Sequence, residues 1–263
     1  MVEQHGVMSK IAILYTDHQN DWVKPWKDFA EMGMKIIEQG RELENDTSVE
    51  VEYTVFDIYH SQFPPIEELK TANGYRGIYI TGSRYDAHDT ATTWVNELRI
   101  FLRMLLTEDG YPPVAGICFG HQIIASALNA KVCRNPLGLE IGVTPITLNK
   151  VGLALFSDVA GATINISELH QDVVEETPEG YSNWGSTSVC ERQGFYRPQK
   201  AISFQGHPEF HTEASQRALD AKLSSIPKSG LNSYDSVKTR NATLKNDGPY
   251  VARYIWKLFK REI

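Results

Sequence analysis

The chain has few cysteines and no long apolar run. Its 263 residues include only Cys118, Cys133 and Cys190, an odd and low number for a disulfide framework, so we expect a reducing compartment. The opening residues, MVEQHGVMSK, lack the basic and apolar regions of a secretory signal. No run of about 18 apolar residues could span a membrane. These absences predict a soluble, cytoplasmic protein without a membrane partner.

Basic residues are also in the minority. The chain has 26 Lys and Arg against 33 Asp and Glu, which gives a formal net charge of −7. A nucleic-acid partner needs a basic face, so this balance argues against one. The histidines and acids show no paired ligand spacing, so we expect no metal and no cofactor. Hydrophobic residues at 41% and charged residues at 22% are typical of a globular chain long enough for a full core.

Strand-like and helix-like segments alternate through the first half of the chain. Residues 10–16, 49–58, 74–83 and 112–117 are apolar and β-rich, and residues 25–40, 91–106 and 121–130 have helical periodicity. This alternation predicts an α/β fold with a mainly parallel central sheet and helices on both faces. Ligands bind beyond the carboxyl ends of such strands, where Cys118 and the Thr81-Gly82-Ser83 turn fall.

The pattern changes beyond residue 131. Residues 139–148, 162–167 and 187–190 predict short antiparallel strands in a small additional sheet, and residues 201–205 predict a return to the central sheet. Residues 224–246 are rich in Ser, Lys and Asn and predict a loop before a final helix near 249–260. We therefore expect an N-terminal extension (1–9), a main domain (10–225) and a C-terminal loop and helix packed on that domain (226–263).

The segment GICFGHQ (116–122) sets Cys118 between a predicted strand and a predicted helix. This arrangement has the shape of a nucleophile elbow, a strained turn whose neighbours, here Gly116 and Gly120, must be small. The start of the helix favours a thiolate, and the N–H of Phe119 is a candidate oxyanion donor. The alternative is a buried structural cysteine, which is common for this residue type. The other two cysteines lack this frame and are predicted to be structural.

A cysteine nucleophile needs a base, and the base needs an orienting group. His121 is close in sequence, but at the start of a helix we expect it to point away. The segment FQGHPEF (204–210) offers His207 and Glu209, whose side chains leave an extended backbone on the same face. Pro208 between them favours that extended lead-in. Alone the segment is typical of an ordinary loop; together with the elbow it predicts a triad.

The motif GICFGHQ followed by FQGHPEF resembles the class I glutamine amidotransferases, whose glutaminase domains use a Cys-His-Glu triad. The resemblance covers about residues 10–225 and implies a flavodoxin-like fold. It implies Cys118 as nucleophile, His207 as general base and acid, and Glu209 as the orienting carboxylate.

The resemblance also implies the groups around the triad. The oxyanion donors fall at Gly82, Ser83 and Phe119, with Ser83 standing where the family has a second glycine. The substrate-binding positions fall at Gln122, His170, Gln171 and Asp172. For the segment ELHQDVV (168–174), a helix or turn cap is the alternative interpretation.

The implied reaction is acyl transfer from glutamine through a thioester. We find no pyrophosphatase loop and no phosphate-binding P-loop motif for an ammonia acceptor in the sequence. We therefore expect a stand-alone glutaminase, or one that serves a separate ammonia-accepting synthase subunit. The alternative is a γ-glutamyl peptidase acting on glutathione-like γ-glutamyl compounds, where only the leaving amine differs. A non-catalytic regulatory or binding protein with this fold is less expected, because all three triad residues are present.

Overall fold

Strand β1 (Ser9–Tyr15) shows why the central sheet is buried on both faces. Ile11 and Ile13 pack into the core on one side of the sheet, and Ala12 and Leu14 pack on the other. All four side chains are fully buried, as in a parallel strand covered by helices on both faces.

The structure, a computed structural model, describes residues 9–18, 21–47, 50–71, 74–159, 161–223 and 234–263.

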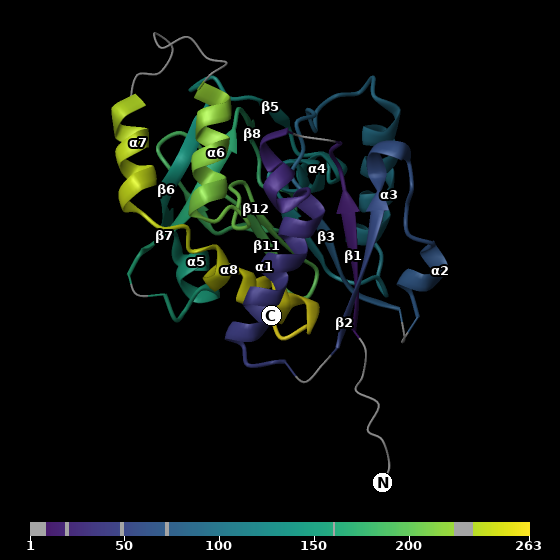
Figure 1. Cartoon of the computed structure of the whole chain (residues 1–263). Helices are drawn as coiled ribbons and strands as arrows, with labels where there is room; N and C mark the ends of the chain where they lie inside the picture. Colours follow the sequence, from purple (N-terminus) through teal and green to yellow (C-terminus); the bar gives the residue numbers. More distant parts are fainter. Residues whose placement is uncertain (1–8, 19–20, 48–49, 72–73, 160, 224–233) are drawn as a thin grey trace.

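The central sheet has the strand order β2-β1-β3-β4-β12-β11-β9 (Figure 1). The strands from β2 to β12 are parallel, and β11 is antiparallel to both of its neighbours. Their bounds are Val51–Asp57 (β2), Tyr75–Ile80 (β3), Val114–Ile117 (β4), Ala201–Phe204 (β12), Phe195–Arg197 (β11) and Ser182–Asn183 (β9). The predicted mainly parallel sheet is confirmed, and residues 201–205 do return to it beside β4.

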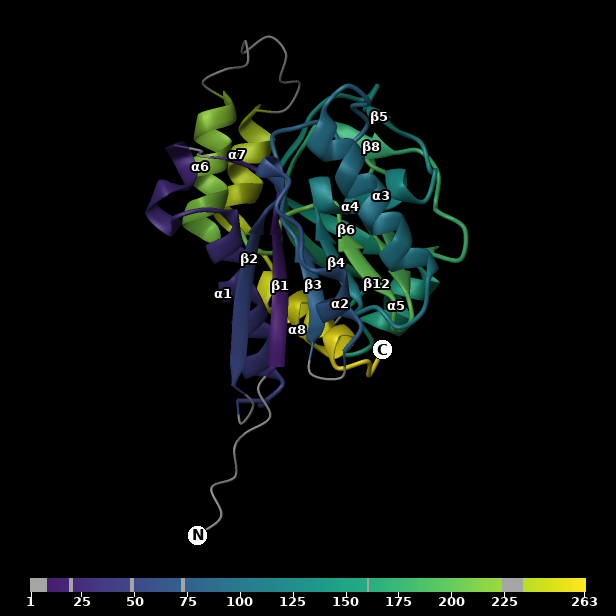
Figure 2. The ribbon, with the colours of Figure 1, turned by 90° about the vertical axis from the view of Figure 1, so that its right-hand side faces the viewer.

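Helices cover both faces of this sheet (Figure 2). Helices α1 (Phe29–Leu43) and α8 (Gly248–Phe259) pack on one face, and α3 (Thr93–Thr107) and α4 (Phe119–Ala127) pack on the other. Helices α1 and α8 approach closely, since a Cβ on Gly40 would lie 2.4 Å from the carbonyl carbon of Ala252. Shorter elements are η1 (Asp21–Trp26), η2 (Ile58–His60), α2 (Ile66–Leu69) and α5 (Lys150–Leu155).

The predicted additional antiparallel sheet is present. It has the order β10-β6-β7, and a two-stranded ladder of β5 and β8 lies beside it. Their bounds are Val132–Arg134 (β5), Glu140–Leu148 (β6), Thr163–His170 (β7), Asp172–Val174 (β8) and Gly185–Ser186 (β10). The prediction of a strand at residues 187–190 is wrong, because Thr187 closes a turn there. Its N–H donates to the Cys190 carbonyl at 2.8 Å, and its hydroxyl accepts from the Cys190 N–H at 3.0 Å.

The prediction of a loop at residues 224–246 is wrong in its second part. Helix α7 (Tyr234–Thr243) lies there, beside α6 (Thr212–Leu223), and packs on β6. Val237 contributes an apolar contact, and Arg240 donates to the carbonyls of Ile141 and Val143. Residues 224–233 and most of the predicted N-terminal extension lie outside the described residues. Within the described ranges no helix combines the length and the apolar character needed to cross a membrane.

Candidate active site

Cys118 lies at the turn between β4 and α4, with φ 50° and ψ −100°. Residues other than glycine rarely adopt this backbone conformation, so the turn is strained. A Cβ on Gly116 would lie 2.6 Å from the carbonyl oxygen of Gly120, and one on Gly120 would lie 2.7 Å from that of Ile80. The two glycines therefore allow a sharp turn that places the cysteine at the start of the helix, as a nucleophile elbow requires.

His207 and Glu209 meet Cys118 at the carboxyl edge of the sheet. The Nδ1 atom of His207 lies 2.8 Å from Oε1 of Glu209, and the ring stacks on Phe210 with centroids 4.0 Å apart. A Cβ placed on Gly82 would lie 2.9 Å from Cε1 of His207 and 3.8 Å from Cβ of Cys118, so both side chains border that glycine. All three triad side chains are largely buried, with Cys118 and Glu209 6% exposed and His207 3% exposed.

The charge state of His207 follows from these neighbours. Burial disfavours the imidazolium, but negative charge on Glu209 and then on the Cys118 sulfur, with the hydrogen bonds to both, outweighs it, and the pKa of His207 rises to about 10. The ring is therefore protonated at neutral pH. Glu209 occupies Nδ1, which leaves Nε2 for the sulfur. A positive charge beside a cysteine stabilises the thiolate, the nucleophilic form of the side chain.

Unpaired backbone donors lie next to the cysteine. Among the described residues, no acceptor bonds the backbone N–H of Gly82, Ser83 or Phe119. The Ser83 side chain is used elsewhere: its hydroxyl donates to the Thr16 carbonyl at 2.6 Å and accepts from the Tyr85 N–H at 3.2 Å. The serine thus fixes the turn and leaves the neighbouring N–H groups available to an oxyanion.

Cys118 and His207 line a cleft of about 330 Å³, which Gln122, His170, Gln171 and Asp172 also line. Gln122 Nε2 donates to the Asp172 carbonyl and to Gln205 Oε1, both at 3.2 Å. The HQD segment lies between β7 and β8 and is not a helix cap. Both ring nitrogens of His170 are engaged, Nδ1 with the Asp172 carbonyl at 2.9 Å and Nε2 with Glu140 Oε2 at 3.0 Å. His170 therefore shapes the segment, and neither ring nitrogen is free to hydrogen-bond a substrate in the cleft.

Comparison with known proteins gives the family. The model of the glutamine amidotransferase class-I family matches residues 34–224. The chain belongs to this family. The chain is 46% identical over 257 residues to "Putative glutamine amidotransferase YLR126C" of Saccharomyces cerevisiae, covering 97% of this chain and 99% of the relative. It is 32% identical over 171 residues to gamma-glutamyl peptidase 4 of Arabidopsis thaliana, covering 64% and 66% of the two chains.

Solved structures support the flavodoxin-like class I fold. The crystal structure of a glutamine amidotransferase from Thermotoga maritima superposes with a TM-score of 0.66 and covers 96% of this chain and 98% of that chain. The sequence identity is 18%, so this likeness concerns the fold alone.

Residues that sequence reasoning missed lie in the cleft and beside it. Gln205 Nε2 lies 3.8 Å from the Cys118 sulfur, and Arg134 forms an ion pair with Asp172 at 2.8 Å. Trp22 and Phe29 line another part of the cleft. Gln205 lies inside the FQGHPEF motif, which is the one local signal for it. The others come from η1, α1 and β5, and only the fold brings them to the cleft.

Proposed function

We propose that this amidotransferase hydrolyses γ-glutamyl amide bonds through a thioester on Cys118. The observation that carries the proposal is the meeting of Cys118 and His207 beside Gly82 in one cleft, with Glu209 hydrogen-bonded to the far nitrogen of the His207 ring. The elbow strain, the protonated His207 and the unpaired N–H groups beside the cysteine support the same chemistry. Glutamine is the simplest substrate that fits it.

Each step assigns a proton or a bond to a named group. The Cys118 thiolate attacks the γ-carbonyl carbon, and the resulting oxyanion accepts hydrogen bonds from the N–H groups of Phe119 and of the Gly82-Ser83 turn. His207 gives its proton to the leaving nitrogen as the carbon–nitrogen bond breaks. Neutral His207 then takes a proton from water, which attacks the thioester and releases glutamate and the thiolate. Each oxyanion donor contributes roughly 10²–10³ in rate.

Glu209 has an orienting role in this mechanism. Its hydrogen bond to Nδ1 holds the imidazole in the tautomer that presents Nε2 to the sulfur and the substrate. Its charge stabilises the imidazolium that forms each time His207 takes up a proton.

A γ-glutamyl peptide is the second candidate substrate, and the shape of the cleft favours it. Beyond the triad the cleft is lined by Trp22 and Phe29 and by Ala218, Ala221 and Lys222 of α6. Departing ammonia needs no such surface, whereas the amine of a γ-glutamyl peptide has atoms to place against it. The similarity to an Arabidopsis γ-glutamyl peptidase supports this candidate as well.

Substitution of the nucleophile tests the proposal. We expect Cys118→Ser and Cys118→Ala to lower glutamate release by roughly 10³-fold or more while the thermal unfolding midpoint stays near that of the parent. Cys133→Ser, at a partly exposed thiol that does not line the cleft, is the matched control and should keep full activity. Substantial turnover by the Cys118 variants would refute the thioester mechanism.

A substrate screen separates the two candidates. Glutamine, γ-glutamyl dipeptides and glutathione are compared, and glutamate, ammonia and free amine are all measured. Preference for glutamine identifies a glutaminase, and preference for peptides identifies a γ-glutamyl peptidase. A low glutaminase rate that rises on addition of a copurified ATP-using synthase would assign the ammonia to a separate subunit.

A further inference from the structure

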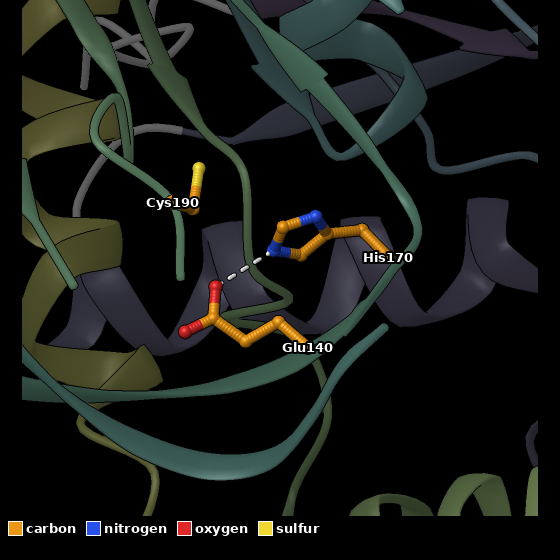
Figure 3. A group of neighbouring side chains, drawn as sticks. All are labelled: Glu140, His170 and Cys190. Atoms are coloured by element: carbon orange, nitrogen blue, oxygen red, sulfur yellow. Dashed lines mark hydrogen bonds and ion pairs between the residues drawn. The ribbon is translucent and has the colours of Figure 1, made fainter. Parts of the chain in front are cut away.

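Beside the proposed catalytic cleft, acidic, imidazole and thiol side chains are buried against one another. Glu140 on β6 pairs in register with His170 on β7, and Cys190 comes from the turn that follows β10. Figure 3 shows the Glu140 carboxylate hydrogen-bonded to the His170 ring, with the Cys190 side chain beside them. Their ligand atoms all lie within 4.8 Å of one another, and all three residues are buried. Glu168, also on β7, brings a second carboxylate, with Oε2 3.3 Å from Nε2 of His170.

The cluster holds two carboxyl groups and a thiol but only one imidazole. A carbonyl only accepts hydrogen bonds, so the His170 Nδ1 beside the Asp172 carbonyl carries a proton. Nε2 then faces Glu140 and Glu168 together. Both Glu168 oxygens are buried and accept no hydrogen bond from any described residue. Buried carboxylates of this kind are normally paired or bound to a metal ion.

We propose that Glu140, His170 and Cys190 bind a zinc ion, with Glu168 as the fourth ligand. Zinc prefers four nitrogen, sulfur and oxygen ligands in a tetrahedron, at about 2.0–2.3 Å from the metal. Neighbouring ligand atoms in such a tetrahedron are roughly 3.2–3.6 Å apart. The distances of 3.0 and 3.3 Å from Nε2 to the two carboxylates are close to that spacing.

The surroundings orient these side chains as a metal site requires. His170 donates its other ring N–H to a backbone carbonyl, the usual arrangement for a zinc-bound histidine. Glu140 accepts from the Thr187 hydroxyl at 2.6 Å and from Gln193 Nε2 at 2.9 Å. The Cys190 thiol, which now donates to the Arg192 carbonyl at 3.4 Å, would release its proton to solvent when it binds the metal.

With four protein ligands and no open position, the ion would be structural. It would fasten the end of β7 to β6 and to the turn after β10. The same strand holds the base, because the Ser167 carbonyl accepts the backbone N–H of His207 at 2.7 Å. Glu140 also lines a second cavity, beside Thr187 and Arg240, which gives the ion a route from solvent.

Cobalt substitution tests the site with a readout that does not depend on activity. Zinc content is measured on full-length chain purified without chelator, and Co²⁺ is then titrated into chelator-treated protein. We expect about one zinc per chain and a near-ultraviolet thiolate-to-cobalt charge-transfer band. Both should persist in Cys118→Ser and Cys133→Ser and disappear in Cys190→Ser, which identifies the liganding thiol.

Glu168→Gln is a second variant, used in case Cys190→Ser fails to fold, because it keeps the shape of the side chain and removes only the carboxylate that is proposed to bind zinc. We expect this variant to fold and to bind zinc at least about tenfold more weakly. Wild-type protein that is folded, free of zinc and without a cobalt band would overturn the proposal. So would a cobalt band that Cys118→Ser or Cys133→Ser removes.

Discussion

His121 and His207 come after the neighbouring parallel strands β4 and β12, at the same edge of the sheet, but they lie in different surroundings. His121 is fully buried, stacks on Phe195 and bonds Ser203 through Nδ1 at 2.9 Å. Burial lowers the pKa of His121 to about 3, so the ring stays neutral at physiological pH. The ring also faces away from the proposed catalytic residues. Only His207 combines a carboxylate partner with contact to the cysteine.

The two histidines therefore make a matched pair for substitution. We expect His207→Gln to lower kcat/KM by roughly 10²–10⁴, the usual contribution of a general acid–base. His121→Gln should keep most of the activity and lose thermal stability instead, because it disturbs a packed, hydrogen-bonded position. Steady-state glutamate release measures the activity of both variants, and thermal unfolding measures their stability. The reverse order of activity would show that the base is misassigned.

His207 also makes the free energy of unfolding depend on pH. Its folded-state pKa of about 10 lies above the ordinary value of 6.5, so the folded protein binds the proton more tightly than the unfolded chain does. The resulting stabilisation is fully present below about pH 6.5 and is lost as the pH rises through about 10. Urea unfolding at several pH values should show the wild-type free energy falling toward that of His207→Gln over this window. A difference that stays constant with pH would contradict the raised pKa.

At the residue scale, local spacing predicted the triad and little else around it. The glycines flanking Cys118 and the two-residue step from His207 to Glu209 are visible in short segments. The engagement of both His170 nitrogens is not, because Nδ1 bonds a backbone carbonyl and because the pairing of β6 with β7 brings Glu140 to Nε2. The same holds for the proposed zinc ligands, whose positions in the sequence follow no ligand spacing.

Among the elements, the segment after α7 supports the loop that carries His207. Asn246 Nδ2 donates to the carbonyls of His207 at 2.8 Å and of Phe210 at 2.7 Å. Gly248 packs so closely that a Cβ there would lie 1.8 Å from the Pro208 carbonyl oxygen. Residues 246–248 therefore help to position the loop that carries His207.

Removal of the Asn246 amide should loosen that loop. We expect Asn246→Ala to lower kcat by roughly tenfold with little change in KM, because small errors in placing a catalytic group cost rate more than binding. It should also cost about 1 kcal/mol of stability. Lys245→Ala, at the exposed neighbouring position, is the control and should change neither. Equal effects of the two substitutions would show that the hydrogen bonds do not position the base.

Element prediction failed where tertiary contacts decide the conformation. Helix α7 (YDSVKTRNAT) is polar, and packing on β6 through Val237 together with the hydrogen bonds of Arg240 and Asn241 holds it there. Thr187 and Val189 have high β propensity, yet the Thr187 side chain closes a turn through backbone N–H groups. Longer elements such as β1 and α3 carry enough apolar periodicity to be predicted.

At the scale of the whole molecule, the two ends of the described chain form one core. Helix α8 packs on α1 and on the face of the sheet to which β1 contributes Ile11 and Ile13. Alternating patterns predict a layered α/β fold, but not which strands are neighbours. The order of the strands depends on contacts such as those of α8, which join residues more than two hundred positions apart. One of them is the hydrogen bond from Trp256 Nε1 to Asp46 Oδ2 at 3.0 Å.

Trp256 offers the strongest test of the packing of α8 against α1 and the sheet, because its large side chain is fully buried between them. We expect Trp256→Ala to lower the free energy of unfolding by about 3–5 kcal/mol, from lost apolar burial and the cavity left behind. Domains are stable by only about 5–15 kcal/mol, so the urea midpoint should fall markedly. Lys257→Ala, next on the same helix, removes an ion pair with Glu44 and should cost about 1 kcal/mol or less. Activity per folded molecule should be unchanged in both variants, since neither residue contacts the triad. If Trp256→Ala and Lys257→Ala lowered the free energy of unfolding by similar amounts, α8 would be peripheral to the core.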